Sequence, residues 1–190
     1  MTGTTAGLVL AAGAGSRYGM PKALIPYPEQ LLVERAVDTL RAAALSQIVV
    51  VLGAAAEQVR AAAPALPTTV INPDWPTGLG SSLRTGLEAL TETPAEAAVV
   101  LLVDMPGVTP EAVRRVTAHA TADALVMGGY GPRRGHPVLL GRAHWPGVLT
   151  SATGDSGARS YLKSHPVRVV PVDDVADDLD LDVPELNPHA

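Results

Sequence analysis

Short apolar runs alternate with helix-like segments along most of the chain, and this alternation restricts the fold more than any other feature. The first run, about Ala6–Ala11, is almost wholly apolar, as expected for a strand with both faces buried. Gln47–Leu52, Thr68–Asn72 and Ala97–Val103 are predicted as further strands, and Gln30–Ala43 has helical periodicity. Because strands that alternate with helices build layered sheets, we expect an α/β fold with Ala97–Val103, the strongest strand signal, at its centre.

The remaining elements are expected on similar grounds. Thr109 before Pro110 is a strong signal for the start of a helix. In the last third, a turn region at Gly128–Gly135 separates two shorter strands. The other expected elements are helices at Ala54–Ala63, Ser81–Leu90 and Gly157–His165, and strands at Ala124–Met127, Pro137–Leu140 and Val167–Val172.

Length and composition exclude several classes of protein. The 190 residues fit a single domain, residues 1–190, with an acidic tail from about Asp173. A net charge of −5 gives no general attraction for nucleic acid or an anionic membrane, and the absence of cysteine excludes disulfides and thiolate metal sites. No apolar stretch reaches the roughly 18 residues of a membrane span, and no basic residue precedes the first apolar run. We therefore expect a cytoplasmic protein.

A glycine-rich loop follows the first strand. Gly13, Gly15 and Gly19 allow backbone N–H groups to approach an anion without obstruction by a Cβ atom. Arg17 and Lys22 place positive charge beside them, which suits a triphosphate. An ordinary connection made of small residues is the alternative, and the two basic side chains favour phosphate binding.

Two common phosphate-binding loops do not match. The Walker A loop requires Gly-Lys-Ser/Thr, whereas Lys22 lies between Pro21 and Ala23. The dinucleotide fingerprint Gly-x-Gly-x-x-Gly needs glycine where Tyr18 stands. It also needs an acidic residue about 20 residues later at the end of the next strand, a position that here falls within a helix. Both interpretations are excluded.

The loop from Leu10 to Lys22 resembles the signature of the NTP-transferase superfamily, Leu-Ala-Ala-Gly-x-Gly-x-Arg-x-Gly-x-x-Lys, at every fixed position. Four further segments resemble the MobA-like branch, and molybdenum cofactor cytidylyltransferases in particular: Asn72–Leu87, Val103–Pro106, Gly135–Val138 and Gly154–Arg159. The resemblance implies a three-layer, Rossmann-like nucleotidyltransferase fold with a mostly parallel central sheet flanked by helices. It also implies that the nucleotide is bound by Leu10, Ala11, Ala12, Gly13, Ala14, Gly15, Ser16, Arg17 and Lys22.

Two acidic positions are candidates for a metal site. Asp104 directly follows the strongest strand, where ligands bind in open α/β sheets, and a carboxylate together with substrate phosphates suits Mg²⁺. The segment Asp180–Leu186 resembles the acidic tail of the family, although Val183 replaces a threonine and a later aspartate is missing. The resemblance implies Asp180 as the second metal ligand, with Asp182 close behind. A solvated tail without a role in the site is the alternative.

Two further regions are candidates for the nucleoside and the acceptor. Gly78, Gly80, Ser81 and Ser82 lie where a loop enters a helix, so their N–H groups and hydroxyls can bond a base or ribose, or one serine can simply cap the helix. Asn72 belongs to the same family-like stretch.

Arg133, Arg134 and His136 form a basic patch, and the resemblance implies that Arg134 and His136 bind the acceptor. Asp155 and Arg159 are spaced to pair with each other across one helical turn, which would make them part of the scaffold.

Together these features favour a Mg²⁺-dependent nucleotidyltransferase with Arg17, Lys22 and Asp104 as its catalytic residues. The resemblance implies transfer from CTP, or GTP, to a phosphorylated acceptor such as molybdopterin, and a possible molybdoenzyme or chaperone partner. Two alternatives stay open: a MobA-like oxidoreductase of the nicotine blue type, and a non-catalytic chaperone that carries a cofactor in the same pocket.

Overall fold

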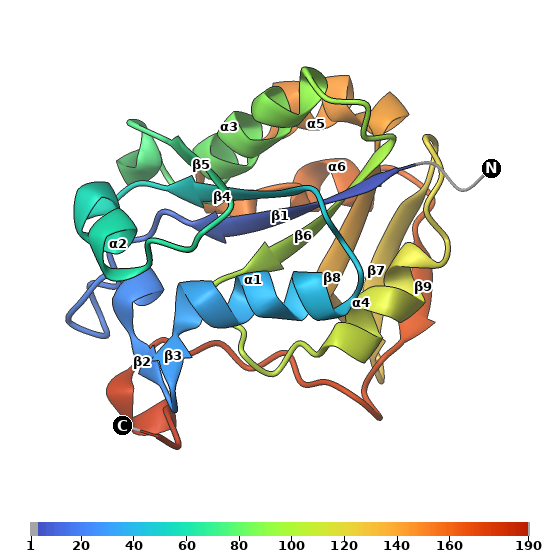
Figure 1. The fold of residues 1–190 in the computed structure, drawn as a ribbon. Helices are drawn as coiled ribbons and strands as arrows, with labels where there is room; N and C mark the ends of the chain where they lie inside the picture. Colours follow the sequence, from blue (N-terminus) through green and yellow to red (C-terminus); the bar gives the residue numbers. More distant parts are fainter. Residues whose placement is uncertain (1–3, 190) are drawn as a thin grey trace.

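The computed structural model describes residues 4–189, and these residues form one seven-stranded sheet with helices on both faces and a separate two-stranded ribbon (Figure 1). The strands of the large sheet are β1 (Thr5–Ala11), β4 (Ile48–Leu52), β5 (Thr68–Ile71), β6 (Ala97–Leu102), β7 (Leu125–Tyr130), β8 (Arg133–Gly141) and β9 (Arg168–Pro171). The ribbon consists of β2 (Pro26–Tyr27) and β3 (Gln30–Leu31).

Helices precede or follow most of these strands along the chain. The α-helices are α1 (Leu32–Ala42), α2 (Ala56–Ala62), α3 (Leu79–Thr91), α4 (Pro110–Thr117), α5 (Trp145–Ser151) and α6 (Arg159–Lys163). Short 3₁₀ turns are η1 (Lys22–Leu24), η2 (Trp75–Thr77), η3 (Arg142–His144), η4 (Gly154–Ser156) and η5 (Pro184–Leu186). In the part of the chain that the structure describes, none of these helices has the length and apolar character of a membrane span.

The sheet is mostly parallel and has the strand order β5-β4-β1-β6-β8-β7-β9. β4 and β6 both run parallel to β1, β5 runs parallel to β4, and β9 runs parallel to β7. β8 runs antiparallel to its neighbours β6 and β7. The expected parallel α/β sheet is therefore confirmed, and β6, predicted to be central, occupies the middle position.

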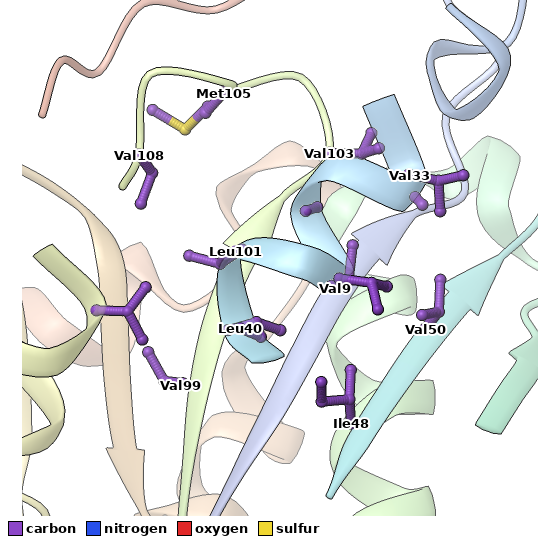
Figure 2. Close-up of a cluster of buried hydrophobic side chains, with 14 of the residues drawn as sticks. Val9, Val33, Leu40, Ile48, Val50, Val99, Leu101, Val103, Met105 and Val108 are labelled. Carbon is purple, nitrogen blue, oxygen red and sulfur yellow. The ribbon is translucent and has the colours of Figure 1, made fainter. Parts of the chain in front are cut away.

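Successive residues of the inner strands point to opposite faces and fill two separate apolar cores. Along β1, Val9 packs into the core beneath α1, α2 and α4, whereas Leu8 packs into the core beneath α3, α5 and α6. Figure 2 shows the first of these cores, where Val9, Val50 and Leu101 come from three adjacent strands. Burial on both faces explains why these strands read as continuous apolar runs. Helices on both faces also confirm the three-layer arrangement.

Three local predictions differ from the structure. The expected turn region, residues 128–135, is mostly strand, because Tyr130 pairs with Arg133 and Gly128 pairs with Gly135. This pairing outweighs the low strand preference of glycine. The helix predicted from Gln30 begins at Leu32, because Gln30 and Leu31 pair with β2. α5 was not predicted, since its Trp-Pro-Gly start reads as a turn, although proline is tolerated in the first turn of a helix.

The chain after β9 packs across the carboxyl-end edge of the parallel strands. The backbone N–H of Asp177 donates to the carbonyl of Gly107 (3.2 Å), and that of Leu181 donates to the carbonyl of Asp104 (2.9 Å). The Leu181 side chain is buried in the first core. In Figure 1 this red segment continues to the C-terminus beside β2. The acidic tail is thus docked on the fold, which contradicts the alternative of a solvated tail.

Candidate nucleotide site

The glycine-rich loop between β1 and η1 closes on itself at the carboxyl end of β1. Gly15 has φ +61°, and a Cβ atom there would fall 1.9 Å from the carbonyl oxygen of Met20, so glycine is required. The N–H of Gly19 donates to the carbonyl of Gly15 (2.8 Å). A Cβ atom at Gly13 would meet nothing within 4 Å. Open space therefore borders the loop on one side, as an anion-binding loop requires.

A cavity of about 510 Å³ lies beside this loop. Most of the predicted nucleotide residues line it, and Asp104 does so as well. The predicted residues in its wall are Leu10, Ala12, Gly13, Ala14, Gly15, Ser16, Arg17, Lys22, Gly78, Ser82 and Asp104. The phosphate loop, the loop before α3 and the end of β6 thus meet at one site, which agrees with the rule that ligands bind at the carboxyl edge of such sheets.

The ammonium of Lys22 lies between two carboxylates in this cavity. Lys22 Nζ donates to Asp104 Oδ2 at 2.5 Å and to Asp182 Oδ1 at 2.6 Å. Burial lowers the pKa of Lys22, but the hydrogen bonds and charges of the two aspartates outweigh it, so the net pKa is raised. The hydrogen bond from Lys22 in turn holds the pKa of Asp182 below its ordinary value. Lys22 is therefore positively charged at neutral pH.

Arg17 and Asp180 lie at the edge of this charge cluster. Arg17 is largely exposed, and its Nη1 lies 3.6 Å from Asp182 Oδ2. Among the described residues, Asp180, the predicted second metal ligand, forms no ion pair with Lys22 and is exposed, whereas Asp182 faces the cavity. Partial desolvation of its carboxyl group, followed by the negative charges of Asp104 and Asp182, raises the pKa of Asp180. Asp182 thus shares the Lys22 ammonium with Asp104, and Asp180 lies close enough for both of their negative charges to act on its carboxyl group.

The predicted nucleoside residues separate into cavity-lining and supporting groups. Asn72 is buried behind the cavity, where its Nδ2 donates to Ser81 Oγ (2.8 Å) and Ser82 Oγ (3.0 Å). Ser81 Oγ lies 3.0 Å from the carbonyl oxygen of Asp74 and 2.9 Å from that of Gly78, so its one hydroxyl hydrogen is already used within the loop. Of these three residues, Ser82 alone lies in the described cavity wall, and the structure does not support direct nucleotide contacts by Asn72 or Ser81.

Three further expectations from the sequence are corrected. Gly80 faces the segment between α5 and η4 rather than the cavity, because a Cβ atom there would fall 2.7 Å from the backbone nitrogen of Thr153. Ala11 points into the first core and lies outside the cavity wall. No serine caps α3, because its N-cap residue is Gly78 and no side chain caps its first turn.

Sequence reasoning underestimated the far wall of the cavity. Trp75, Pro76, Leu79 and Asp155 line it together with Gly78. Gly78 has φ +112°, and a Cβ atom there would fall 2.6 Å from Asp155 Oδ1, so the two segments approach closely. The Gly-Asp-Ser-Gly spacing around Asp155 was the available signal, but it was interpreted as scaffold.

A second, smaller hollow of about 110 Å³ adjoins the first and shares Leu10, Leu79 and Leu102 with it. The predicted acceptor residues Arg134 and His136 both line this hollow, and Arg159 lines it as well. The expected pair between Asp155 and Arg159 is absent from the described residues, and the two side chains face different hollows.

The basic patch of the sequence is divided by the fold. Arg133 makes a double ion pair with Asp178 of the tail, at 2.7 and 3.0 Å, and so faces the tail instead of the hollow. Burial lowers the pKa of His136 to about 4, a shift that the charge of Asp104 opposes and that of Arg159 reinforces. His136 is therefore uncharged at neutral pH, whereas Arg134 and Arg159 are cations.

The residues present fit a hard divalent cation that is completed by its substrate. Among residues 4–189, no group of three or more His, Cys, Asp or Glu side chains is arranged to hold a metal ion by itself. Asp104 and Asp182 nevertheless bring two carboxylates to one point, the position of Lys22 Nζ. Mg²⁺ is commonly held by one or two carboxylates plus substrate phosphates and water, so this donor set suits it.

The fold and site agree with the family that sequence comparison identifies. The MobA-like NTP transferase domain matches residues 7–169, and the chain belongs to this family. Family membership makes it a nucleotidyltransferase-like protein with a nucleoside triphosphate as the expected ligand.

The proteins that this chain is similar to carry different names. The chain is 38% identical to nicotine blue oxidoreductase of Paenarthrobacter nicotinovorans, over 84% of this chain and 82% of the relative. Rv0371c from Mycobacterium tuberculosis H37Rv is similar in structure, with a TM-score of 0.82 and 33% identity over 96% of this chain and 94% of the other. A second structure of Rv0371c is described as a complex with manganese.

A more distant relative supports the fold alone. Molybdopterin-guanine dinucleotide biosynthesis protein A from Archaeoglobus fulgidus has a TM-score of 0.61 and 17% identity, covering 89% of this chain and 84% of the other.

Proposed function

We propose that the protein transfers a nucleotidyl group from a nucleoside triphosphate to a phosphorylated small molecule and releases pyrophosphate, with Mg²⁺ as the metal. The observation that carries this proposal is the convergence of a glycine-rich anion loop, two basic side chains and two carboxylates at one cavity. Phosphoryl chemistry depends mainly on positioning and charge neutralisation, and these groups supply both.

In the proposed reaction an oxygen of the acceptor phosphate attacks the α-phosphorus. The bond from that phosphorus to the bridging oxygen breaks, and the bonding electrons leave with pyrophosphate. Lys22, Arg17 and the N–H groups of Gly13–Ser16 stabilise the negative charge that grows on the leaving group. With the Lys22 ammonium turned to the pyrophosphate, Asp104 and Asp182 would be free to hold the metal, which would supply Lewis-acid stabilisation of the reacting phosphate. Because attack and departure are in line, the acceptor must approach opposite to the pyrophosphate.

The proposed substrates follow from the family resemblance of the motifs. CTP is favoured and GTP is possible, with molybdopterin as the proposed acceptor. Release of pyrophosphate should be measured for each of the four NTPs, with and without molybdopterin. We expect turnover with one NTP, most of which disappears in Lys22→Ala and Asp104→Ala while both variants stay folded. Turnover like that of the wild type in both variants would contradict the mechanism.

An oxidoreductase is the second candidate, because the 38% identical relative is named nicotine blue oxidoreductase and an apolar hollow adjoins the cavity. It is tested by following NAD(P)H oxidation in the presence of a quinoid dye. Dye reduction that survives Asp104→Ala, without pyrophosphate release from any NTP, would favour this candidate. Tight nucleotide binding without either reaction would instead favour a cofactor-carrying chaperone.

A further inference from the structure

The second hollow combines an apolar interior with a cationic mouth. Its interior is formed by side chains from one face of the sheet and from α3, among them Leu83, Met127, Val138 and Leu140. These four side chains are buried and contribute no hydrogen-bonding group, so a sugar or another polyhydroxylated body would lose hydrogen bonds with water on entering.

Arg134 and Arg159 line the same hollow, and both are exposed. Among residues 4–189, no acidic side chain lies within 4.0 Å of either guanidinium group. Arg115 and Arg133, in contrast, form ion pairs with aspartates of the tail. Two guanidinium groups at an apolar hollow suit a ligand with one anionic end. His136, which burial keeps neutral, lines the hollow as well, and the charges of Asp104 and Arg159 both act on it.

The hollow adjoins the nucleotide cavity, because Leu10, Leu79 and Leu102 line both. At about 110 Å³ it has room for a group the size of a ring, whereas a second nucleotide would need space comparable to the 510 Å³ cavity. A compact ligand in the hollow can therefore lie beside a nucleotide in the larger cavity without displacing it.

From this geometry we infer that the acceptor is a phosphate monoester whose organic part presents a compact, apolar, flat surface, with Leu83 and Met127 contacting that surface and Arg134 and Arg159 binding the phosphate. This inference rests on the proposed function, since only a transferase has an acceptor. It restricts the acceptor to a class of phosphate monoesters that excludes hexose phosphates. Arg159 thereby becomes a substrate-binding residue.

The test uses the full chain and four probes that separate the two requirements: phenyl phosphate, glucose 1-phosphate, inorganic phosphate and phenol. Binding is followed by NMR of ¹³C-labelled methionine methyl groups. Met127 lines the hollow, Met20 belongs to the phosphate loop and Met105 lies in the opposite core, so the three signals localise each probe.

Phenyl phosphate is expected to shift Met127 but not Met105, and to bind about tenfold more tightly than glucose 1-phosphate or inorganic phosphate, because its ring is buried. Arg134→Gln and Arg159→Gln should each weaken it about threefold, since both arginines are exposed. Arg168→Gln on β9 is the matched control and should leave the affinity unchanged.

Equal affinity for the three phosphates would overturn the apolar requirement, and phenol binding as tightly as phenyl phosphate would overturn the anionic one. A shift of Met20 without Met127 would place the ligand in the phosphate loop and would overturn the site. If these binding results hold but no NTP yields pyrophosphate, the proposed function fails and the ligand class of the hollow stands. If pyrophosphate is released but Met127 does not respond, the proposed function stands and this inference fails.

Discussion

Replacing Lys22 by methionine keeps most of the side-chain length and removes the positive charge from between two carboxylates. The side chains of Lys22 and Asp104 are only 16% and 17% exposed, so their contact resembles a partly buried, charge-assisted hydrogen bond, worth roughly 1.5–3 kcal/mol. Asp182 is 42% exposed, and solvent screening limits its contact to at most about 1 kcal/mol.

The cost is partly offset because the variant no longer has to bury an ammonium group. We therefore expect Lys22→Met to lower the free energy of unfolding by about 2 kcal/mol at pH 7. For a chain of this length, that corresponds to a decrease of roughly 4–8 °C in Tm. Thermal unfolding followed by circular dichroism measures it, and Lys163→Met, which changes the other lysine of the chain at an exposed position, is the control.

The effect should depend on pH in a defined direction. The pKa of Lys22 is raised above its ordinary 10.5, so its contribution is complete below that pH and is lost as the pH rises through the higher folded-state value. The pKa of Asp182 is lowered below its ordinary 3.8, so its contribution is present above that value and is lost as the pH falls through the lower folded-state value. The difference between wild type and variant should be largest between these limits and shrink towards pH 3. A variant as stable as the wild type at pH 7, or a difference that grows in acid, would refute the reasoning.

Three further predictions address the metal, the packing and the histidine. Asp182→Asn should weaken Mn²⁺ binding in the presence of NTP by at least about tenfold, because it removes a charged ligand. Asp180→Asn should have a smaller effect. The reverse order of the two effects in a calorimetric titration would favour Asp180 as the ligand. Gly80→Ala should destabilise the fold by about 1–3 kcal/mol through overlap with the backbone of Thr153, and an unchanged midpoint in urea would contradict this close packing. His136, whose pKa is lowered to about 4 from 6.5, should make the folded state less stable as the pH falls from 6.5 towards 4, because the unfolded chain takes up the proton first. The imidazole resonances titrated by NMR test this directly, and a midpoint near 6.5 would contradict the burial argument.

The strands were predictable to within about a residue at most ends because both faces of the sheet are covered. β4 is buried at every position, so its sequence is a continuous apolar run that can be recognised without knowledge of its neighbours. β7 and β8 were less predictable, since their glycines are strand residues only through pairing with each other. The start of α1 was displaced for a similar reason, because Gln30 and Leu31 pair with β2.

The residues of the candidate site were likewise predictable where they lie in one contiguous segment, and less so where their roles depend on tertiary contacts. The residues from Leu10 to Lys22 were found from the sequence because glycine spacing and two basic side chains in one contiguous loop already define an anion site. Asn72 and Ser81 were predicted as nucleotide ligands because their amide and hydroxyl groups lie near the start of a helix. Such groups can bind a ligand, but they can equally hold a loop in place by internal hydrogen bonds. The hydrogen bonds from Asn72 to Ser81 and from Ser81 to the carbonyl of Gly78 show that these side chains stabilise the loop, and these bonds exist only in the folded chain.

The sequence by itself determined the layered α/β fold, the phosphate loop and the position of Asp104 after the central strand, since each depends on residues close together in the chain. Only the tertiary structure decided that Lys22 meets Asp104 and Asp182, which are 82 and 160 positions away. It also decided that the tail docks with Leu181 buried, and that Arg134, His136 and Arg159 share one hollow. These contacts depend on how separate elements pack, and packing is a property of the whole core that no local pattern encodes.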